Sequence, residues 1–287
     1  MITYSSPCQD FSAAGLQKGG DIGSGTRSSL LWECERIIRA VKPKYLLMEN
    51  VKNLVGEKHK HNFIRWLRVL EMMGYQSYWK VLNAKDYGVP QNRERVFVVS
   101  ILGCGQYLFP NPVKLEKRLK DVLESNVDEK YYLSDKLIQG FMNRTEKQLA
   151  KNGGFVFRPT DGNCVGMAIT SKAGTRTVDN YIKEPKIIQS SHGFNKGNVY
   201  KNAPTITSSG YENNNFLNYN YRIRKLTPRE CWRLMGVKDE QFNKLHDLSN
   251  TQLYKLAGNS IVVDVLMGIF KNLLLSDEGT TGQLTLF

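Results

Sequence analysis

Residues 75–102 read YQSYWKVLNAKDYGVPQNRERVFVVSIL, with an apolar run at each end and a polar middle. The runs at 75–82 and 95–102 are rich in β-branched and aromatic residues, which is typical of strands. Only twelve residues separate them, too few for the helical crossover between parallel neighbours, so we expect antiparallel pairing. If the first strand runs with the rest of a parallel sheet, Arg93 and Arg95 lie at the carboxyl edge of that sheet.

Upstream, the chain alternates between strand and helix patterns. Short apolar runs at 2–4 and 45–48 predict strands. Apolar residues at helical spacing predict helices over 30–41 and 62–73. This alternation is typical of an α/β fold with a doubly wound, largely parallel sheet.

A cysteine stands just after the first predicted strand. Cys8 follows Ser-Ser-Pro, which places it on a loop at the carboxyl end of that strand, where open α/β sheets bind their ligands. Its thiolate suits a nucleophile, although an isolated Pro-Cys pair more often marks a cysteine that only packs. Residues 9–27 are polar and glycine-rich, so we expect a long functional loop, after which Ser28 or Ser29 can cap the first helix.

Composition narrows the class of protein. The chain has 287 residues, 41% hydrophobic and 23% charged, as in globular proteins, and no apolar run or leader pattern that predicts a membrane or secreted protein. The net charge of +13 favours a polyanionic partner, and we expect nucleic acid. Five scattered cysteines and four unclustered histidines predict neither a disulfide framework nor a metal site, which points to a reducing cytoplasm.

After about residue 105 the sequence changes character. Residues 114–124 predict a short helix, and 142–220 are rich in Gly, Asn, Ser and Thr, with ten Lys or Arg against five Asp or Glu. We expect an irregular, basic, β-containing domain there. Helices then return: residues 227–230 form a capping box with proline at the first helical position, and Asn259-Ser260 precedes the last helix.

Five short stretches together resemble the cytosine-5 DNA methyltransferase family, and the resemblance covers nearly all of the chain. In order they are Ser6-Pro7-Cys8-Gln9, Glu49-Asn50-Val51, Gln91-Asn92-Arg93-Glu94-Arg95, Arg224-Lys225-Leu226-Thr227-Pro228-Arg229-Glu230 and Gly258-Asn259-Ser260. Each motif is short, but five in the family's order are specific. The resemblance implies a partial Rossmann-like α/β methyltransferase sheet with an inserted basic, β-containing target-recognition domain. The expected parts are a catalytic domain (1–105), a target-recognition domain (106–220), a return to the catalytic domain (221–275) and a flexible tail (276–287).

The resemblance also implies a reaction: transfer of methyl from S-adenosylmethionine to carbon-5 of a cytosine flipped out of duplex DNA, without a metal. Cys8 would add to carbon-6 as the nucleophile. Glu49 would hydrogen-bond N3 and the amino group and stabilise the charge that moves into the ring. Arg95, with Arg93, would hold the base at its O2 side. The alternative for the two arginines is a surface ion pair with Glu94.

One departure concerns the methyl donor. The family normally places a Phe-x-Gly-x-Gly loop and two acidic residues ahead of the Pro-Cys loop, and none of them precedes Cys8 here. Pro7, Leu30, Asn259 and Ser260 are the remaining cofactor-binding candidates. We expect the chain alone to bind S-adenosylmethionine poorly. A separate N-terminal half of a split methyltransferase, a truncated or wrongly started reading frame, and a defunct remnant are three explanations.

The end of the chain suggests a further partner. Gln283, Leu284, Leu286 and Phe287 match the peptide by which bacterial proteins dock on the DNA sliding clamp, although a tail that folds back on its own core explains these residues as well. The expected function is methylation within restriction–modification or phage self-protection, in the cytoplasm of a bacterial or phage-infected cell. The alternatives are an RNA cytosine-5 methyltransferase and a catalytically inactive DNA-binding protein.

Overall fold

A computed structural model describes residues 1–7, 11, 23–151, 156–189, 198–200 and 216–275. Cys8, the rest of the expected loop over 9–27 apart from Phe11 and residues 23–27, and the tail over 276–287 lie outside the described residues. The chain divides into two compact units. The first comprises Met1–Gly88, Arg93–Leu115 and Val263–Phe287, and the second comprises Val89–Asn92 and Glu116–Val262. That residues 106–220 read DNA stays a prediction.

The first unit is built on a four-stranded sheet in the order β1-β2-β5-β3. Its strands are β1 (Ile2–Tyr4), β2 (Tyr45–Val51), β3 (Tyr75–Asn83) and β5 (Glu94–Leu102). β1 and β2 are parallel, and β5 is antiparallel to both β2 and β3. β3 therefore runs with β1 and β2, which confirms the pairing predicted from the length of the connector.

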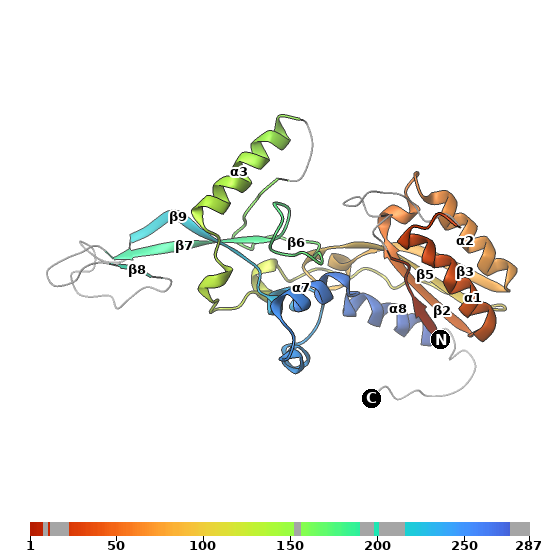
Figure 1. The fold of residues 1–287 in the computed structure, drawn as a ribbon. Coiled ribbons are helices and arrows are strands. Elements are labelled where there is room, and N and C mark those ends of the chain that lie inside the picture. Colours follow the sequence, from red (N-terminus) through yellow and green to blue (C-terminus); the bar gives the residue numbers. More distant parts are fainter. Residues whose placement is uncertain (8–10, 12–22, 152–155, 190–197, 201–215, 276–287) are drawn as a thin grey trace. The chain divides into compact units, whose positions relative to one another are not determined.

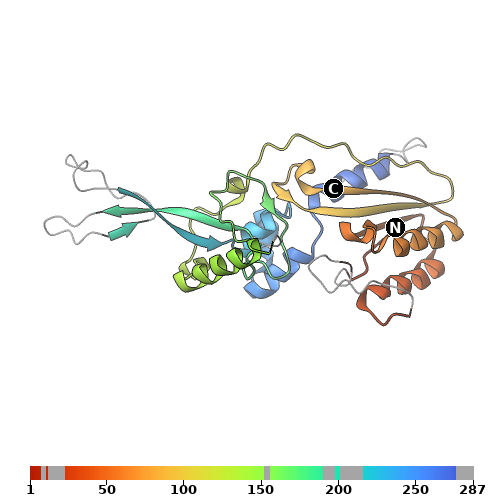
Figure 2. The ribbon, with the colours of Figure 1, turned by 90° about the horizontal axis from the view of Figure 1, so that it is seen from above.

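Helices cover both faces of this sheet. Figure 2 shows α1 (Leu31–Val41) and α2 (Lys60–Met72) on one face and α8 (Val263–Leu275) on the other. Strand residues alternate between the faces, so every second apolar side chain of β2 and β5 packs under α1 and α2. The buried cluster on that side includes Leu46, Met48, Val96, Val98, Ile38, Trp66 and Leu70.

The second unit combines a β-ribbon with short helices. In the three-stranded antiparallel sheet β8-β7-β9, the strands are β7 (Tyr181–Gln189), β8 (Asn198–Tyr200) and β9 (Phe216–Lys225). Figure 1 shows α3 (Asp135–Leu149) beside this ribbon, and Phe141 of α3 packs on Tyr181 of β7 with ring centroids 5.7 Å apart. A second, two-stranded sheet pairs β4 (Gln91–Asn92) in parallel with β6 (Gly166–Met167). The remaining helices are α5 (Pro228–Arg233), α6 (Asp239–Phe242) and α7 (Asn250–Asn259).

Short 3-10 turns account for the other regular segments among the described residues. They are η1 (Arg27–Leu30), η2 (Lys52–Val55), η3 (Ala84–Tyr87), η4 (Leu119–Val122), η5 (Glu129–Tyr131) and η6 (Asn243–Leu245). The helix predicted over 114–124 is therefore wrong in extent, since only η4 forms there. α3 was not predicted, although Leu137, Ile138, Phe141 and Met142 recur at helical spacing after Ser134, which caps this helix.

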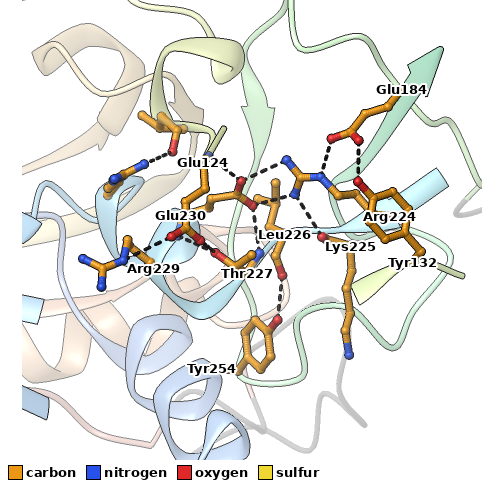
Figure 3. A network of polar contacts seen from close by, with 12 residues as sticks. Glu124, Tyr132, Glu184, Arg224, Lys225, Leu226, Thr227, Arg229, Glu230 and Tyr254 are labelled. Carbon is orange, nitrogen blue, oxygen red and sulfur yellow. Dashed lines mark hydrogen bonds and ion pairs between the residues drawn. The ribbon is translucent and has the colours of Figure 1, made fainter. Parts of the chain in front are cut away.

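The junction between β9 and α5 contains a buried polar network (Figure 3). Arg224 is 1% exposed and Glu230 is 0% exposed. The guanidinium of Arg224 donates to both carboxylate oxygens of Glu230, at 2.9 and 3.0 Å, and to Glu184 at 2.6 Å. Thr227 and Glu230 form the predicted capping box of α5. The motif at 224–230 is thus a structural joint within the second unit.

One part of the chain resembles a membrane span by composition. Residues Asn250–Leu274 have the length and hydropathy of such a span, but they form two helices, α7 and α8, that belong to different units. The apolar stripe of α8, with Val265, Ile269 and Leu273, is buried in the first unit. Because the segment breaks after Asn259 and the apolar stripe of α8 is buried, we interpret it as two helices that pack in the core.

Candidate active site

Glu49 lies at the carboxyl end of β2, and the strand register decides what it faces. Glu49 is opposite Phe97 and Val51 is opposite Arg95, so Glu49 and Arg95 are diagonal neighbours on one face of the sheet. A diagonal pair is within reach of long side chains. Nε of Arg95 lies 3.0 Å from Oε1 of Glu49, and the two side chains are only 21% and 13% exposed. The sheet topology thus brings together two residues that are 46 positions apart.

The surroundings of Glu49 change its acidity. Burial raises the pKa of the Glu49 carboxyl, and the positive charges of Arg95 and Arg93 act in the opposite direction. The net shift is upward, so this carboxyl keeps its proton to a higher pH than an exposed glutamate does. A buried carboxyl of this kind can donate a hydrogen bond to a ring nitrogen as negative charge develops there.

Arg93 precedes β5 directly and is 4% exposed. Its main chain is tied to the end of β3: its N–H donates to Oδ1 of Asn83 at 3.0 Å, and its carbonyl accepts from the N–H of Ala84 at 3.1 Å. Glu94 forms an exposed ion pair with Lys52 at 2.9 Å. The alternative of an ion pair between Glu94 and the arginine side chains is therefore not what the structure contains: Glu94 pairs with Lys52, and Arg95 pairs with Glu49.

The residues on either side of the Cys8 position are anchored beside the same strand end. Nδ2 of Asn50 donates to the carbonyl and the hydroxyl of Ser6, at 3.1 and 3.0 Å. The hydroxyl of Ser28 donates to the carbonyl of Pro7 at 2.5 Å. Beyond the undescribed residues, Asn53 donates to the carbonyl of Phe11 at 2.6 Å. Glu49 and the residue before Cys8 are thus fixed at the carboxyl ends of two adjacent parallel strands.

Three of these anchors were not found from the sequence. Ser28 was expected to cap the first helix, but α1 has no side-chain cap and Ser28 bonds to Pro7 instead. Asn53 and Asn83 carry no motif of their own. Asparagine at the end of a strand often indicates a turn, and Asn83 does cap the turn η3. Their partners lie far away in the sequence or across a connector, which no local pattern reveals.

The cofactor-binding candidates lie in both units. Pro7 and Leu30 belong to the first unit, and Leu30 is 51% exposed. Asn259 and Ser260 belong to the second, where Asn259 ends α7 and the Ser260 hydroxyl donates to the carbonyl of Leu256 at 2.7 Å. None of the four is a carboxylate. That these four residues bind the methyl donor stays a prediction.

Two neighbouring motif residues have structural roles in the second unit. Gln91 is fully buried, donates to the carbonyl of Leu234 at 2.5 Å and accepts from the N–H of Ile169 at 3.0 Å. A Cβ on Gly258 would lie 2.2 Å from the main-chain nitrogen of Ser171, so only glycine fits there. In the described part of the chain, His, Cys, Asp and Glu side chains do not gather in a group that could hold a metal.

Known proteins resemble this chain along its length. The model of the C-5 cytosine-specific DNA methylase family matches residues 1–275. The type II methyltransferase M2.ScrFI of Lactococcus lactis subsp. cremoris is 44% identical over 275 residues, which cover 95% of this chain and 66% of that protein. The orphan methyltransferase M.SssI of Spiroplasma monobiae is 36% identical, over 94% of this chain and 64% of its own length. The chain therefore spans somewhat less than two thirds of these relatives.

Solved structures share the fold. The methyltransferase EhMeth of Entamoeba histolytica matches with a TM-score of 0.64 and 21% identity, over 96% of this chain and 76% of that one. The Dnmt2 methyltransferase of S. pombe matches with a TM-score of 0.60, also at 21% identity, over 96% of this chain and 77% of that one. Together with the family match over residues 1–275, this places the chain in the C-5 cytosine-specific DNA methylase family.

Proposed function

We propose that this protein is a DNA (cytosine-5)-methyltransferase that acts on a cytosine flipped out of duplex DNA. The observation that carries the proposal is the buried pair of Glu49 and Arg95 beside the anchored residues that lead into Cys8. Family membership supports the same reaction. The net charge of +13 supports a nucleic-acid partner, because phosphate contacts from Lys and Arg supply much of the affinity.

Each residue has a defined part in this proposal. The Cys8 thiolate forms a bond to carbon-6, and the electron pair of the 5,6 double bond becomes available at carbon-5. Glu49, whose raised pKa favours the protonated form, donates to N3 as charge spreads into the ring. Arg95 and Arg93 hold the O2 side of the base. S-adenosylmethionine would supply the methyl group to carbon-5 and be released as S-adenosylhomocysteine, and removal of the carbon-5 proton would then restore the 5,6 double bond and expel the Cys8 thiolate.

The first test is transfer of labelled methyl from S-adenosylmethionine to unmethylated duplex DNA, with Cys8→Ala as the control. We expect transfer by the wild type and none by the variant. Duplex DNA containing 5-fluorocytosine should also trap a covalent adduct, because the fluorine blocks the final elimination. Transfer that persists in Cys8→Ala would refute the assigned nucleophile, and transfer to RNA in preference to duplex DNA would favour an RNA methyltransferase.

The finer proposals concern partners and setting. Pro7, Leu30, Asn259 and Ser260 stay the proposed donor contacts, and we propose that a second polypeptide helps to hold S-adenosylmethionine, because none of these four residues is a carboxylate that could bind its ribose. Tight, stoichiometric binding of S-adenosylmethionine by the chain alone, measured by calorimetry, would argue against this.

We also keep the sliding-clamp proposal for the end of the chain, residues 283–287, which lie outside the described residues. Pull-down of the clamp should be lost when Leu286 and Phe287 are deleted. The proposed setting is restriction–modification or phage self-protection in the bacterial cytoplasm, in line with the type II methyltransferases among the relatives.

A further inference from the structure

The side chain of Asn83 links the two ends of the connector between β3 and β5. Asn83, the last residue of β3, accepts from the N–H of Arg93 at 3.0 Å and from the N–H of Lys85 at 3.4 Å. The next residue, Ala84, donates its N–H to the carbonyl of Arg93 at 3.1 Å. Both main-chain polar groups of Arg93 are therefore bound by the two residues at the end of β3.

The position of Arg93 matters for the site. In an extended chain, residues two apart project to the same face, so Arg93 and Arg95 are aimed at the same side of the sheet as Glu49. Arg93 is 4% exposed, and burial raises the pKa of Glu49 while the positive charges of Arg95 and Arg93 oppose that rise. Because Arg93 precedes the first residue of β5, the ladder of that strand does not fix its main chain. The hydrogen bonds from Asn83 and Ala84 do.

We propose that Asn83 is a positioning residue for the active site: its side-chain oxygen fixes the main chain of Arg93 and thereby sets the direction in which the Arg93 side chain leaves the start of β5. The inference rests on the proposed function for its catalytic consequence, but its geometry is independent of it. The competing role is a local cap of the turn η3, since Asn83 also accepts from Lys85. The contact with Arg93 is the shorter of the two, which favours positioning.

The two roles predict different behaviour for three variants. Asn83→Asp keeps the acceptor oxygen at the same reach. Asn83→Ser keeps a hydroxyl that can cap a turn locally, but its oxygen is one bond closer to the main chain and does not reach Arg93. Asn83→Ala removes both contacts. Asp128→Ala serves as a matched control, because Asp128 caps the 3-10 turn η5 in the second unit.

The test is a titration of the Glu49 carboxyl by carbon-13 NMR, with the resonance assigned by its loss in Glu49→Gln. If Asn83 positions Arg93, Asn83→Ser and Asn83→Ala raise the pKa of Glu49 further, because one of its two opposing positive charges is displaced. Asp128→Ala leaves the titration as in the wild type, whereas Asn83→Asp adds a negative charge and is therefore compared by methyl transfer, which it should retain. Methyl transfer by the Ser and Ala variants should fall about 10- to 100-fold in kcat with little change in KM for DNA.

A wild-type titration in Asn83→Ser would overturn the proposal, whatever its melting temperature, since a turn cap alone would then explain the residue. If Asn83→Ala does not fold, Asn83→Ser decides the question by itself. If the wild type transfers no methyl group, the proposed function fails, while the titration still confirms or refutes the positioning of Arg93.

Discussion

Glu230→Gln is the sharpest test of the joint between β9 and α5, because the change keeps the shape of the side chain and removes its charge. Four donors face the two carboxylate oxygens of Glu230. Arg224 supplies two of them, the N–H of Thr227 donates at 2.8 Å and the N–H of Glu124 at 2.8 Å. A glutamine presents one oxygen and one NH₂ group, so two of the four donors lose their acceptor and face another donor.

The expected loss follows from those two bonds. A hydrogen bond to a charged group contributes about 1.5–3 kcal/mol, and removal of one partner of a buried ion pair costs about 3–5 kcal/mol. We therefore expect Glu230→Gln to lower the free energy of unfolding of the second unit by about 3–5 kcal/mol. Hydrogen exchange should report it, through faster exchange of the amides of β9 and α5, together with urea denaturation.

The matched control is Glu129→Gln, which removes the carboxylate paired with Arg222 at the surface, where the Glu129 side chain is 76% exposed. An exposed pair of this kind contributes at most about 1 kcal/mol. If Glu230→Gln costs no more than Glu129→Gln, the buried network does not hold this joint, and the reasoning is refuted.

Three further predictions concern the site and its supports. Gly258→Ala forces a methyl group into main-chain atoms 2.2 Å away and should lower the melting temperature strongly, whereas Gly140→Ala, which meets nothing within 4 Å, should stabilise α3 by about 0.5–1 kcal/mol. Ser28→Ala should slow adduct formation with 5-fluorocytosine DNA, while Ser29→Ala, which loses only a bond within its own turn, should not. Glu49→Gln should be more stable than the wild type at pH 8, with a difference that shrinks towards pH 4. Because the pKa of Glu49 is raised in the folded state, its protonated carboxyl stabilises the fold fully at a pH below the unfolded-state pKa, and this stabilisation is lost as the pH rises through the folded-state pKa. Equal pH dependence of stability in the two proteins would contradict this.

The parts that could be predicted from the sequence are those set by chain length and strand polarity. The stretch between the two predicted strands is too short for a crossover helix, which predicts antiparallel pairing; with β3 running parallel to β2, this places Arg93 and Arg95 at the carboxyl edge of β2. The pairing of Glu49 with Arg95 follows from that topology, because the end of β2 lies beside the start of its antiparallel neighbour β5. The resemblance to the family named the same residues independently.

The parts that could not be predicted depend on tertiary contacts. Ser28 has the chemistry of a helix cap, and nothing near it in the sequence indicates that the carbonyl of Pro7, 21 residues earlier, is its partner. Arg224 pairs with Glu184, 40 residues away and on a different strand. α3 is a different case: Leu137, Ile138, Phe141 and Met142 recur at helical spacing after the cap Ser134, and the helix was missed because it adjoins the Gly-, Asn- and Ser-rich segment that indicates irregular structure.

Within each motif, the residues that fit the chemistry are few and the rest support them. In Glu49-Asn50-Val51, Glu49 faces Arg95 while Asn50 holds Ser6. A residue placed for chemistry in a buried site is under electrostatic strain, whereas a supporting residue such as Asn50 satisfies buried polar groups. Substitution of Glu49 should therefore abolish transfer and increase stability at high pH, and Asn50→Ala should lower stability and rate together. The two kinds of residue can thus be told apart by measurements of stability and rate on the same variants, without reference to any other protein.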